Sequence, residues 1–282
     1  MHELHSSAAR PELKWYVRAF AQRKIDLDSA EIVEPMPASL EQILDFEFGV
    51  HPIVAFGDGR RIPAYSVSVV GPSAYCPADL HLSGGVESFA IFFQPLAFSR
   101  LFHIPMGNLV NLQYDAGDVL GAEILQLWHK MSETASFTER VEFVEEYLLV
   151  KAANCLENTP VVNAALHMFA SKGVARISDI ANQSSLSLRQ FERRFASEIG
   201  LNPKLYSRVA RFQAVLDAKL NCKDLCWLNL AHEFEYHDQM HMIKDFQNFS
   251  GWSPENLLLR LGDMRPPALA ASICTAETLP GS

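Results

Sequence analysis

The N-terminal third of the chain alternates apolar and polar positions, the pattern of half-buried β-strands. Within residues 43–48 the apolar side chains alternate with Asp45 and Glu47, so this acidic pair is expected to face water. Residues 80–93 favour two strands around the pair Gly84–Gly85, a hairpin signal. Such short strands, separated by Pro and Gly, predict an antiparallel β-rich domain of sandwich or barrel type.

After this region the apolar positions recur at intervals of three and four, which is the period of an amphipathic helix. Segments 96–104 and 117–131 are expected to be helices of this kind. Ser136 stands three residues before Glu139, a capping box that predicts a long helix over residues 137–157. Its glutamates are expected in water, and it is expected to connect the two halves of the chain.

The pair Thr159-Pro160 marks the expected domain boundary, because proline favours the first turn of a helix. The fold class predicted is α+β with two domains, a β-rich domain over 1–159 and an all-α domain over 160–265. The tail 266–282 is small, polar and proline-bearing, and it is expected to be disordered.

The all-α part contains two units with one plan. Each has a short helix with an alanine (Ala181, then Ala231), a tight turn, and a second helix buried through apolar side chains three and four residues apart. A long helix over 203–220 joins them. The side chains expected to cap these helices are Ser178, Ser187, Asn202 and Asp238. This plan predicts two helix-turn-helix units.

The formal net charge of −9 is distributed unevenly. Residues 1–160 carry 11 basic and 21 acidic side chains, whereas residues 172–211 carry 8 basic and 3 acidic ones. One acidic domain and one module for an anionic partner are therefore expected. The five cysteines are scattered, and neither a signal peptide nor a membrane span is evident, so the protein is expected in the cytoplasm, without a membrane partner.

The segment 165–262 resembles the DNA-binding domain of the AraC family of bacterial transcription regulators. "ISDIANQSSLSLRQFERRFASEIGLNPKLY" is similar to that family's first helix-turn-helix, and "LAHEFEYHDQMHMIKDFQNFSGWSPENL" to its second. The β-rich half is more loosely similar to the sensor domains of some members. The resemblance implies sequence-specific binding of double-stranded DNA, with a small-molecule effector or a homodimer formed through the N-terminal half.

The exposed side of the helix after Ser187 suits base reading independently of this resemblance. Arg189 and Arg193 lie one turn apart, where Arg can hydrogen-bond guanine, and Gln190 can pair with adenine. Phosphate contacts are expected from Arg194, Arg208 and Arg211. The corresponding side chains of the second unit are Gln239, His241 and Lys244. The alternative without DNA binding is a solvated face on which the arginines pair with nearby glutamates.

Glu235 stands four residues after Ala231, where the AraC family usually has glycine in the turn. A turn with positive φ is therefore expected here, and a side chain at such a position is strained. The residue also brings a negative charge toward the expected path of the DNA.

Other chemistry is weaker in the sequence. Two pairs of side chains have a spacing of four residues, which metal ligands can have: Cys222 with Cys226, and His237 with His241. The cysteines lack a second pair, and His237 precedes a helix cap. No metal, cofactor or catalytic residue is expected. The alternative to a regulator is a DNA-repair alkyltransferase-like enzyme with the same DNA-binding module, for which the N-terminal half offers only two cysteines, Cys76 and Cys155.

Overall fold

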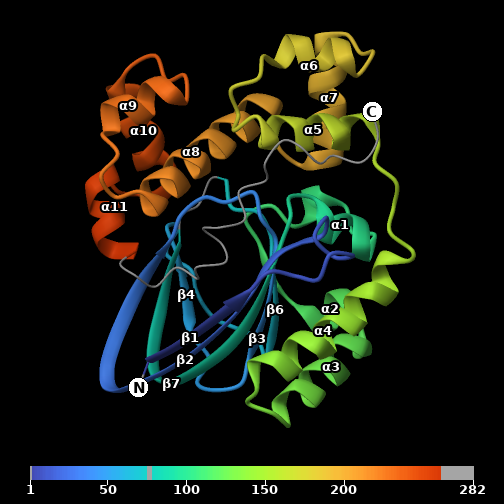
Figure 1. The fold of residues 1–282 in the computed structure, drawn as a ribbon, viewed down its shortest axis with the longest axis vertical. Helices are drawn as coiled ribbons and strands as arrows, with labels where there is room; N and C mark the ends of the chain where they lie inside the picture. The colour runs from blue at the N-terminus through green and yellow to red at the C-terminus, as the bar shows by residue number, and fades with distance from the viewer. Residues whose placement is uncertain (1, 75–77, 262–282) are drawn as a thin grey trace.

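The computed structural model describes residues 2–74 and 78–261, so the expected disordered tail lies outside the described residues. A β-sheet with helices on one face forms the N-terminal half, and a helical half lies across one end of it (Figure 1). Within the described part of the chain the strands make one eight-stranded sheet whose paired strands are all antiparallel. The strands are β1 (His2–Ser7), β2 (Val17–Met36), β3 (Ile43–Glu47), β4 (Ile53–Phe56), β5 (Arg61–Pro63), β6 (Val67–Val70), β7 (Ala78–Phe93) and β8 (Gln113–Asp115).

The sheet has the order β1-β2-β7-β3-β6-β8, and the β4–β5 hairpin pairs with β7 beside β3. The expected hairpin at Gly84–Gly85 is wrong, because β7 runs through both glycines as one strand. Its long partner β2 bends with it: Asp26 pairs with Gly85 and Glu31 with Ser83, with a bulge between them. Extra residues on one strand allow a pair to curve without ending.

Strand β3 is buried on both faces, which corrects the expectation that its acidic residues face water. Leu44 and Phe46 pack into the core under the helices. Asp45 and Glu47 point the opposite way, and Glu47 is 1% exposed. Alternation identified the two faces correctly, but it does not state what covers the second one.

The helices that cover the first face are α1 (Ala97–Phe102), the 3₁₀ turn η1 (Met106–Asn108), α2 (Ala116–Leu120), α3 (Ala122–Ser132) and α4 (Phe137–Ala152). The helix expected over 117–131 is broken at Gly121, whose φ of 81° is left-handed. Ser136 caps α4 as expected, by accepting a hydrogen bond from the Glu139 amide. One glutamate expected in water, Glu145, is instead buried and bound to Arg10 Nε at 2.7 Å.

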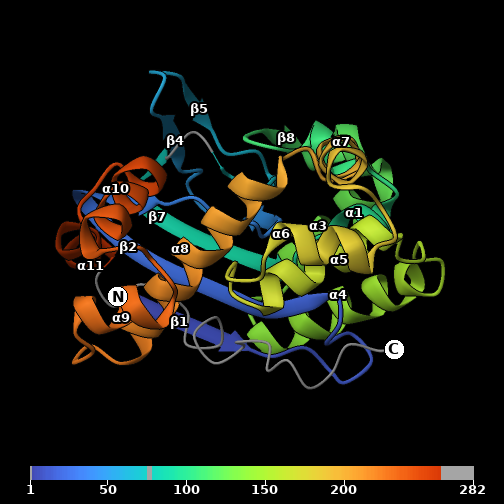
Figure 2. The ribbon, with the colours of Figure 1, turned by 90° about the horizontal axis from the view of Figure 1, so that it is seen from above.

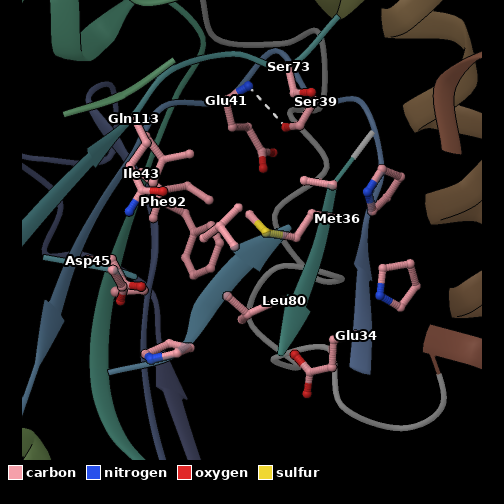
Figure 3. A pocket seen from close by; sticks show the side chains of 18 of the residues that line it. Glu34, Met36, Ser39, Glu41, Ile43, Asp45, Ser73, Leu80, Phe92 and Gln113 are labelled. Atoms are coloured by element: carbon pink, nitrogen blue, oxygen red, sulfur yellow. Dashed lines mark hydrogen bonds between the residues drawn. The ribbon is translucent and has the colours of Figure 1, made fainter. Parts of the chain in front are cut away.

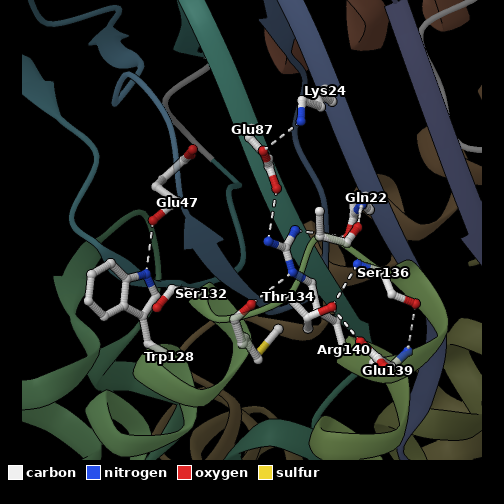
Figure 4. A network of polar contacts seen from close by, with 12 residues as sticks. Gln22, Lys24, Glu47, Glu87, Trp128, Ser132, Thr134, Ser136, Glu139 and Arg140 are labelled. Atoms are coloured by element: carbon white, nitrogen blue, oxygen red, sulfur yellow. Dashed lines mark hydrogen bonds and ion pairs between the residues drawn. The ribbon is translucent and has the colours of Figure 1, made fainter.

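Arg140 attaches α4 to the sheet through a buried polar network (Figure 4). Its guanidinium donates to Glu87 at 2.8 Å, to Gln22 Oε1 at 3.0 Å and to the Met131 carbonyl at 3.1 Å. Burial lowers the pKa of this guanidinium, and Glu87 opposes that shift. Because each buried N–H group finds a carbonyl or carboxylate, the charge can stay inside.

The helical half comprises α5 (Pro160–Ala170), α6 (Ile177–Gln183), α7 (Leu188–Ile199), α8 (Pro203–Asn221), α9 (Trp227–Glu233), α10 (Gln239–Ser250) and α11 (Pro254–Leu261). Thr159 caps α5 and Asn202 caps α8, both by accepting from an amide three residues on. The cap expected at Ser178 is wrong, because α6 already begins after Arg176. Helix α8 runs between the group α5–α7 and the group α9–α11 in both views (Figures 1 and 2).

The two halves share apolar core and polar contacts. Ala38, Leu40 and Met106 of the N-terminal half belong to the same buried cluster as the helical half. Gln213 of α8 accepts from the Leu40 amide at 2.9 Å and donates to the Ser39 hydroxyl at 3.1 Å. These contacts, and not a continuous helix over 137–157, connect the halves, since α4 ends at Ala152.

Candidate functional site

Helix α7 has well-defined ends and a buried side. Ser187 caps it by accepting from the Gln190 amide, and the Gln190 side chain accepts from the Ser187 amide at 3.1 Å, a complete capping box. Phe191 and Phe195 are fully buried. Gly200 ends the helix with a φ of 78°. The opposite side of α7 is thereby fixed as its outer face.

Arg189 and Arg193 lie on that outer face and are exposed. Within the described residues neither makes a hydrogen bond or an ion pair, so the expected pairing with nearby glutamates is not seen for these two arginines. Arg194 does pair with Glu198, at 3.1 Å along the helix. The Gln190 side chain is taken up by the cap.

Helix α10 repeats this arrangement in the second unit. Asp238 caps it by accepting from the His241 amide at 2.7 Å, while Met242 and Phe246 are buried. Lys244 and His241 are exposed, and Gln239 is half-buried. Met240 is 60% exposed, which gives the outer face of α10 an apolar character that α7 lacks.

The turns of the two units have the same backbone geometry. Ser185 and Glu235, each four residues after the alanine of its unit, have φ values of 55° and 53°. The next residue in each turn donates its amide to that alanine's carbonyl, at 3.0 Å in the first unit and 2.8 Å in the second. The positive φ expected at Glu235 is confirmed, and its side chain is exposed.

Two arginines of α8 hold these units in place. Arg208 donates to Asp245 of α10 at 2.6 Å, and Asp245 is 1% exposed. Arg211 donates to the Gly173 carbonyl at 2.9 Å and to the Glu235 carbonyl at 3.3 Å. Their guanidiniums therefore stabilise the helical half, a role that sequence reasoning missed because the partners are distant in the chain.

A cavity of about 340 Å³ lies between the second face of the sheet and the helical half (Figure 3). Strands β2, β3 and β7 contribute many of its lining residues, and Gln213, Leu216 and Asp217 of α8 contribute to it from the helical half. A volume in this range fits a small organic molecule. The acidic residues of β3 were a possible sign of this cavity in the sequence, but the alternating pattern alone predicted that they face water.

The charged side chains that line this cavity are mostly carboxylates. Arg23 binds Glu34 at 2.7 Å, and Arg18 is held by Glu41 and, at 3.3 Å, by Asp217. Burial, followed by the charge of Asp45, raises the pKa of Glu47 to about 9. Burial also raises the pKa of Asp45 to about 6.

The remaining chemistry of the described residues is sparse. No group of three or more His, Cys, Asp or Glu side chains lies close enough to hold a metal ion in residues 2–74 and 78–261. Cys222 and Cys226 are free and exposed, and His237 bonds its neighbour Asp238. Cys76, one of the two cysteines considered for an alkyltransferase, lies outside the described residues.

In that part of the chain no helix has the length and apolarity that crossing a membrane requires.

No family model matches the chain, and no curated protein matches it in sequence. Solved structures of ToxT from Vibrio cholerae do match in fold. One covers 86% of this chain and 98% of its own, with a TM-score of 0.50 at 10% identity. An apo ToxT variant gives a TM-score of 0.51 at 11% identity, with the same coverage.

A ToxT structure with a bound unsaturated fatty acid covers 84% of this chain and 97% of its own, with a TM-score of 0.50 at 10% identity. At this identity the likeness is one of fold. The predicted fold class, an antiparallel β-rich part followed by helices, is confirmed.

Proposed function

We propose that this protein is a sequence-specific DNA-binding transcription regulator of the AraC type, controlled by a small molecule bound in its N-terminal half. The observation that carries the proposal is the pair of helix-turn-helix units with matching turns, caps and buried faces at the two ends of α8. Two recognition helices on one module can enter successive major grooves, about 34 Å apart along the DNA.

In the first unit, Arg189 and Arg193 are the proposed base readers. Both are exposed on the outer face of α7 and lack intramolecular partners among the described residues. A guanidinium that is not already paired can give two hydrogen bonds to guanine without breaking existing ones. Ser187 and Gln190 support this helix through its cap, and the proposed pairing of Gln190 with adenine would require its side chain to leave Ser187.

In the second unit, Gln239, His241 and Lys244 are the proposed contacts, and binding there is expected to be weaker. Residues 212–265 carry 5 basic and 8 acidic side chains, the reverse of the balance around α7. Attraction to phosphate falls with each lost positive charge. Arg194, Arg208 and Arg211 are proposed to contact phosphates with N–H groups that their protein partners leave unused.

The test begins with selection of bound sequences from random DNA by the full chain. Arg193→Ala is then expected to weaken binding to the selected site by about 1 to 3 kcal/mol and to relax preference at one base pair. The matched control is Arg61→Ala, which removes the same charge from the exposed edge of the β4–β5 hairpin. Equal losses in both variants, or no selected sequence at all, would refute the assignment.

The proposed regulation rests on how the N-terminal half contacts both recognition helices. The end of α7 packs on η1, where a Cβ added at Gly200 would meet the Gly107 Cα at 2.5 Å. The end of α10 accepts a hydrogen bond at the Phe249 carbonyl from the Ala38 amide, at 2.7 Å. Gln213, which lines the cavity, bonds Ser39 and Leu40 on the same segment as Ala38.

A molecule in the cavity therefore touches the segment that holds α10 and the helix that joins the two units. The fatty acid bound by ToxT, which has this fold, supports a small-molecule effector for this chain. We expect Gln213→Ala to change the affinity for selected DNA, although Gln213 is buried on α8 and does not belong to the outer face of α7 or α10. Gln126→Ala, an exposed change on α3, is the control. Unchanged affinity in both would contradict the coupling. A homodimer formed through the β-rich half stays a prediction, which sedimentation of the full chain can check.

A further inference from the structure

The chemical class of the effector follows from the cavity wall of β3. Ile43, Asp45 and Glu47 all line the cavity, as alternate residues of one strand must, and Leu44 and Phe46 face away from it. The two carboxyl groups thus leave the strand on one side, from Cα atoms about 7 Å apart. Figure 3 shows Asp45 at the cavity with Ile43 and Phe92 beside it.

Three of the four oxygens of these carboxyls have no hydrogen-bond donor among the described residues. Both Glu47 oxygens and Asp45 Oδ1 are buried without a hydrogen-bond partner among the described residues, and Glu47 is 1% exposed. A buried carboxylate without donors is costly. The two groups lower this cost by holding one proton between them near neutral pH, because burial raises both pKa values and the charge of Asp45 raises that of Glu47 further. One negative charge remains on the pair.

The basic side chains at the cavity are already held. Arg23 is the basic residue whose charge lowers the pKa of both carboxyls, and it is bonded to Glu34. Arg18 is not one of the lining residues, but it is bound to two of them, Glu41 and Asp217 of α8. A ligand carboxylate would therefore have to displace a protein carboxylate from a guanidinium, whereas a ligand cation would supply the donors that Asp45 and Glu47 lack.

Much of the remaining wall is apolar. Its large apolar side chains include Met36, Ile43, Val54, Leu80 and Phe92. They suit a hydrocarbon or ring body of modest size, as the volume of about 340 Å³ also does.

We propose that the effector is an amphipathic organic cation, an amine or guanidinium on an apolar body, whose charged end binds the Asp45 and Glu47 carboxyls. The inference rests on the proposed role of the cavity as the effector site. It sets this chain apart from ToxT, whose bound ligand is a fatty acid. The cation donates its N–H groups to the carboxylate oxygens, and no covalent step is involved.

The test is calorimetric titration of the full chain at pH 7.5 with decylamine, decanoate and decan-1-ol, which share one apolar tail. Decylamine is expected to bind at least about tenfold more tightly than the other two, since a hydrogen bond between charged groups is stronger than a neutral one. The double variant Asp45→Asn/Glu47→Gln, which removes the charge and keeps the shape, should abolish this preference. Glu142→Gln, an exposed change on α4, should leave it intact.

The pH dependence gives a second readout. The charge of Arg23 on β2 opposes the raised pKa values of Asp45 and Glu47, and Arg23 itself is bonded to Glu34. Decylamine binding should weaken as the pH falls below about 6, where the pair becomes neutral. The same titration of the double variant should show no such step.

Preference for decanoate, equal decylamine binding in the double variant, or no saturable binding of decylamine would each overturn the proposal. A separate measurement distinguishes a failure of this ligand assignment from a failure of the proposed function. DNA affinity of the ligand-free chain and of Arg193→Ala tests the regulator assignment alone. If decylamine binds as expected and leaves DNA affinity unchanged, the ligand class stands and the regulatory role of the cavity is wrong.

Discussion

Replacing Glu235 by glycine isolates the energy of one backbone conformation. Glu235 lies two residues after the end of α9, in the turn of the second helix-turn-helix, with a φ of 53°. Its amide donates to the His232 carbonyl at 3.1 Å, and its carbonyl accepts from Arg211. Both bonds use backbone atoms of Glu235, so glycine keeps them. The side chain is exposed, and within the described residues it makes no hydrogen bond or ion pair.

The magnitude follows from two opposing terms. A Cβ in the left-handed region costs about 1 to 2 kcal/mol, which glycine removes. Glycine gives back about 0.5 to 1 kcal/mol because the unfolded chain gains conformational freedom. The net gain in the free energy of unfolding is between about 0 and 1.5 kcal/mol, which corresponds to a rise of up to about 6 °C in melting temperature for a chain of this size.

The assay is thermal unfolding of the full chain followed by circular dichroism. Glu235→Gly is compared with Glu235→Ala, which removes the charge and keeps the Cβ. Ser185→Gly is the matched change in the first unit, where φ is 55°. Both glycine variants should melt higher than the wild type, and the alanine variant should not.

The effect of the Glu235 charge is measured separately, through the affinity for DNA. Glu235→Gly and Glu235→Ala should both bind DNA more tightly at low salt, with the gain fading as salt screens the lost charge. A lower melting temperature for Glu235→Gly would refute the reasoning, because it would mean that the glutamate side chain stabilises the turn by more than its conformation costs.

Three further changes test the buried charges. Arg208→Ala leaves Asp245 buried and unpaired, so we expect a loss of about 3 kcal/mol in urea unfolding, partly recovered by adding Asp245→Asn; no recovery would contradict the pairing. Arg140→Ala removes three buried hydrogen bonds and should cost about 3 to 5 kcal/mol in the same assay, and an unchanged midpoint would show that the network contributes nothing net. Because the folded pKa of Glu47 lies near 9 and its ordinary value is 4.5, the folded chain binds more protons in this range and loses stability as the pH rises through it. Glu47→Gln should flatten that decline in melting temperature between about pH 5 and 9, and an unaltered slope would contradict the raised pKa.

The sequence by itself determined the local features of the helical half. Ser187 and Asp238 cap their helices because each offers a side-chain oxygen to an amide three residues on, and this needs no distant partner. The buried side of α7 follows from its helical period, and the positive φ at Glu235 was expected from the resemblance to a family that usually has glycine at this place in the turn. The order and type of the main elements could be predicted for the same reason.

Tertiary structure alone decided which polar residues are inside. Glu47, Glu145 and Asp245 were indistinguishable in the sequence from solvated carboxylates, because their covering elements come from remote parts of the chain. The continuity of β7 through Gly84 likewise depends on pairing with β2, which local propensity does not contain. The cavity and its carboxyl pair exist only because α8 lies across a sheet face, about 170 residues from the strand that lines it. Periodicity reports the two sides of a strand, and only packing determines whether each side meets water, protein or a ligand.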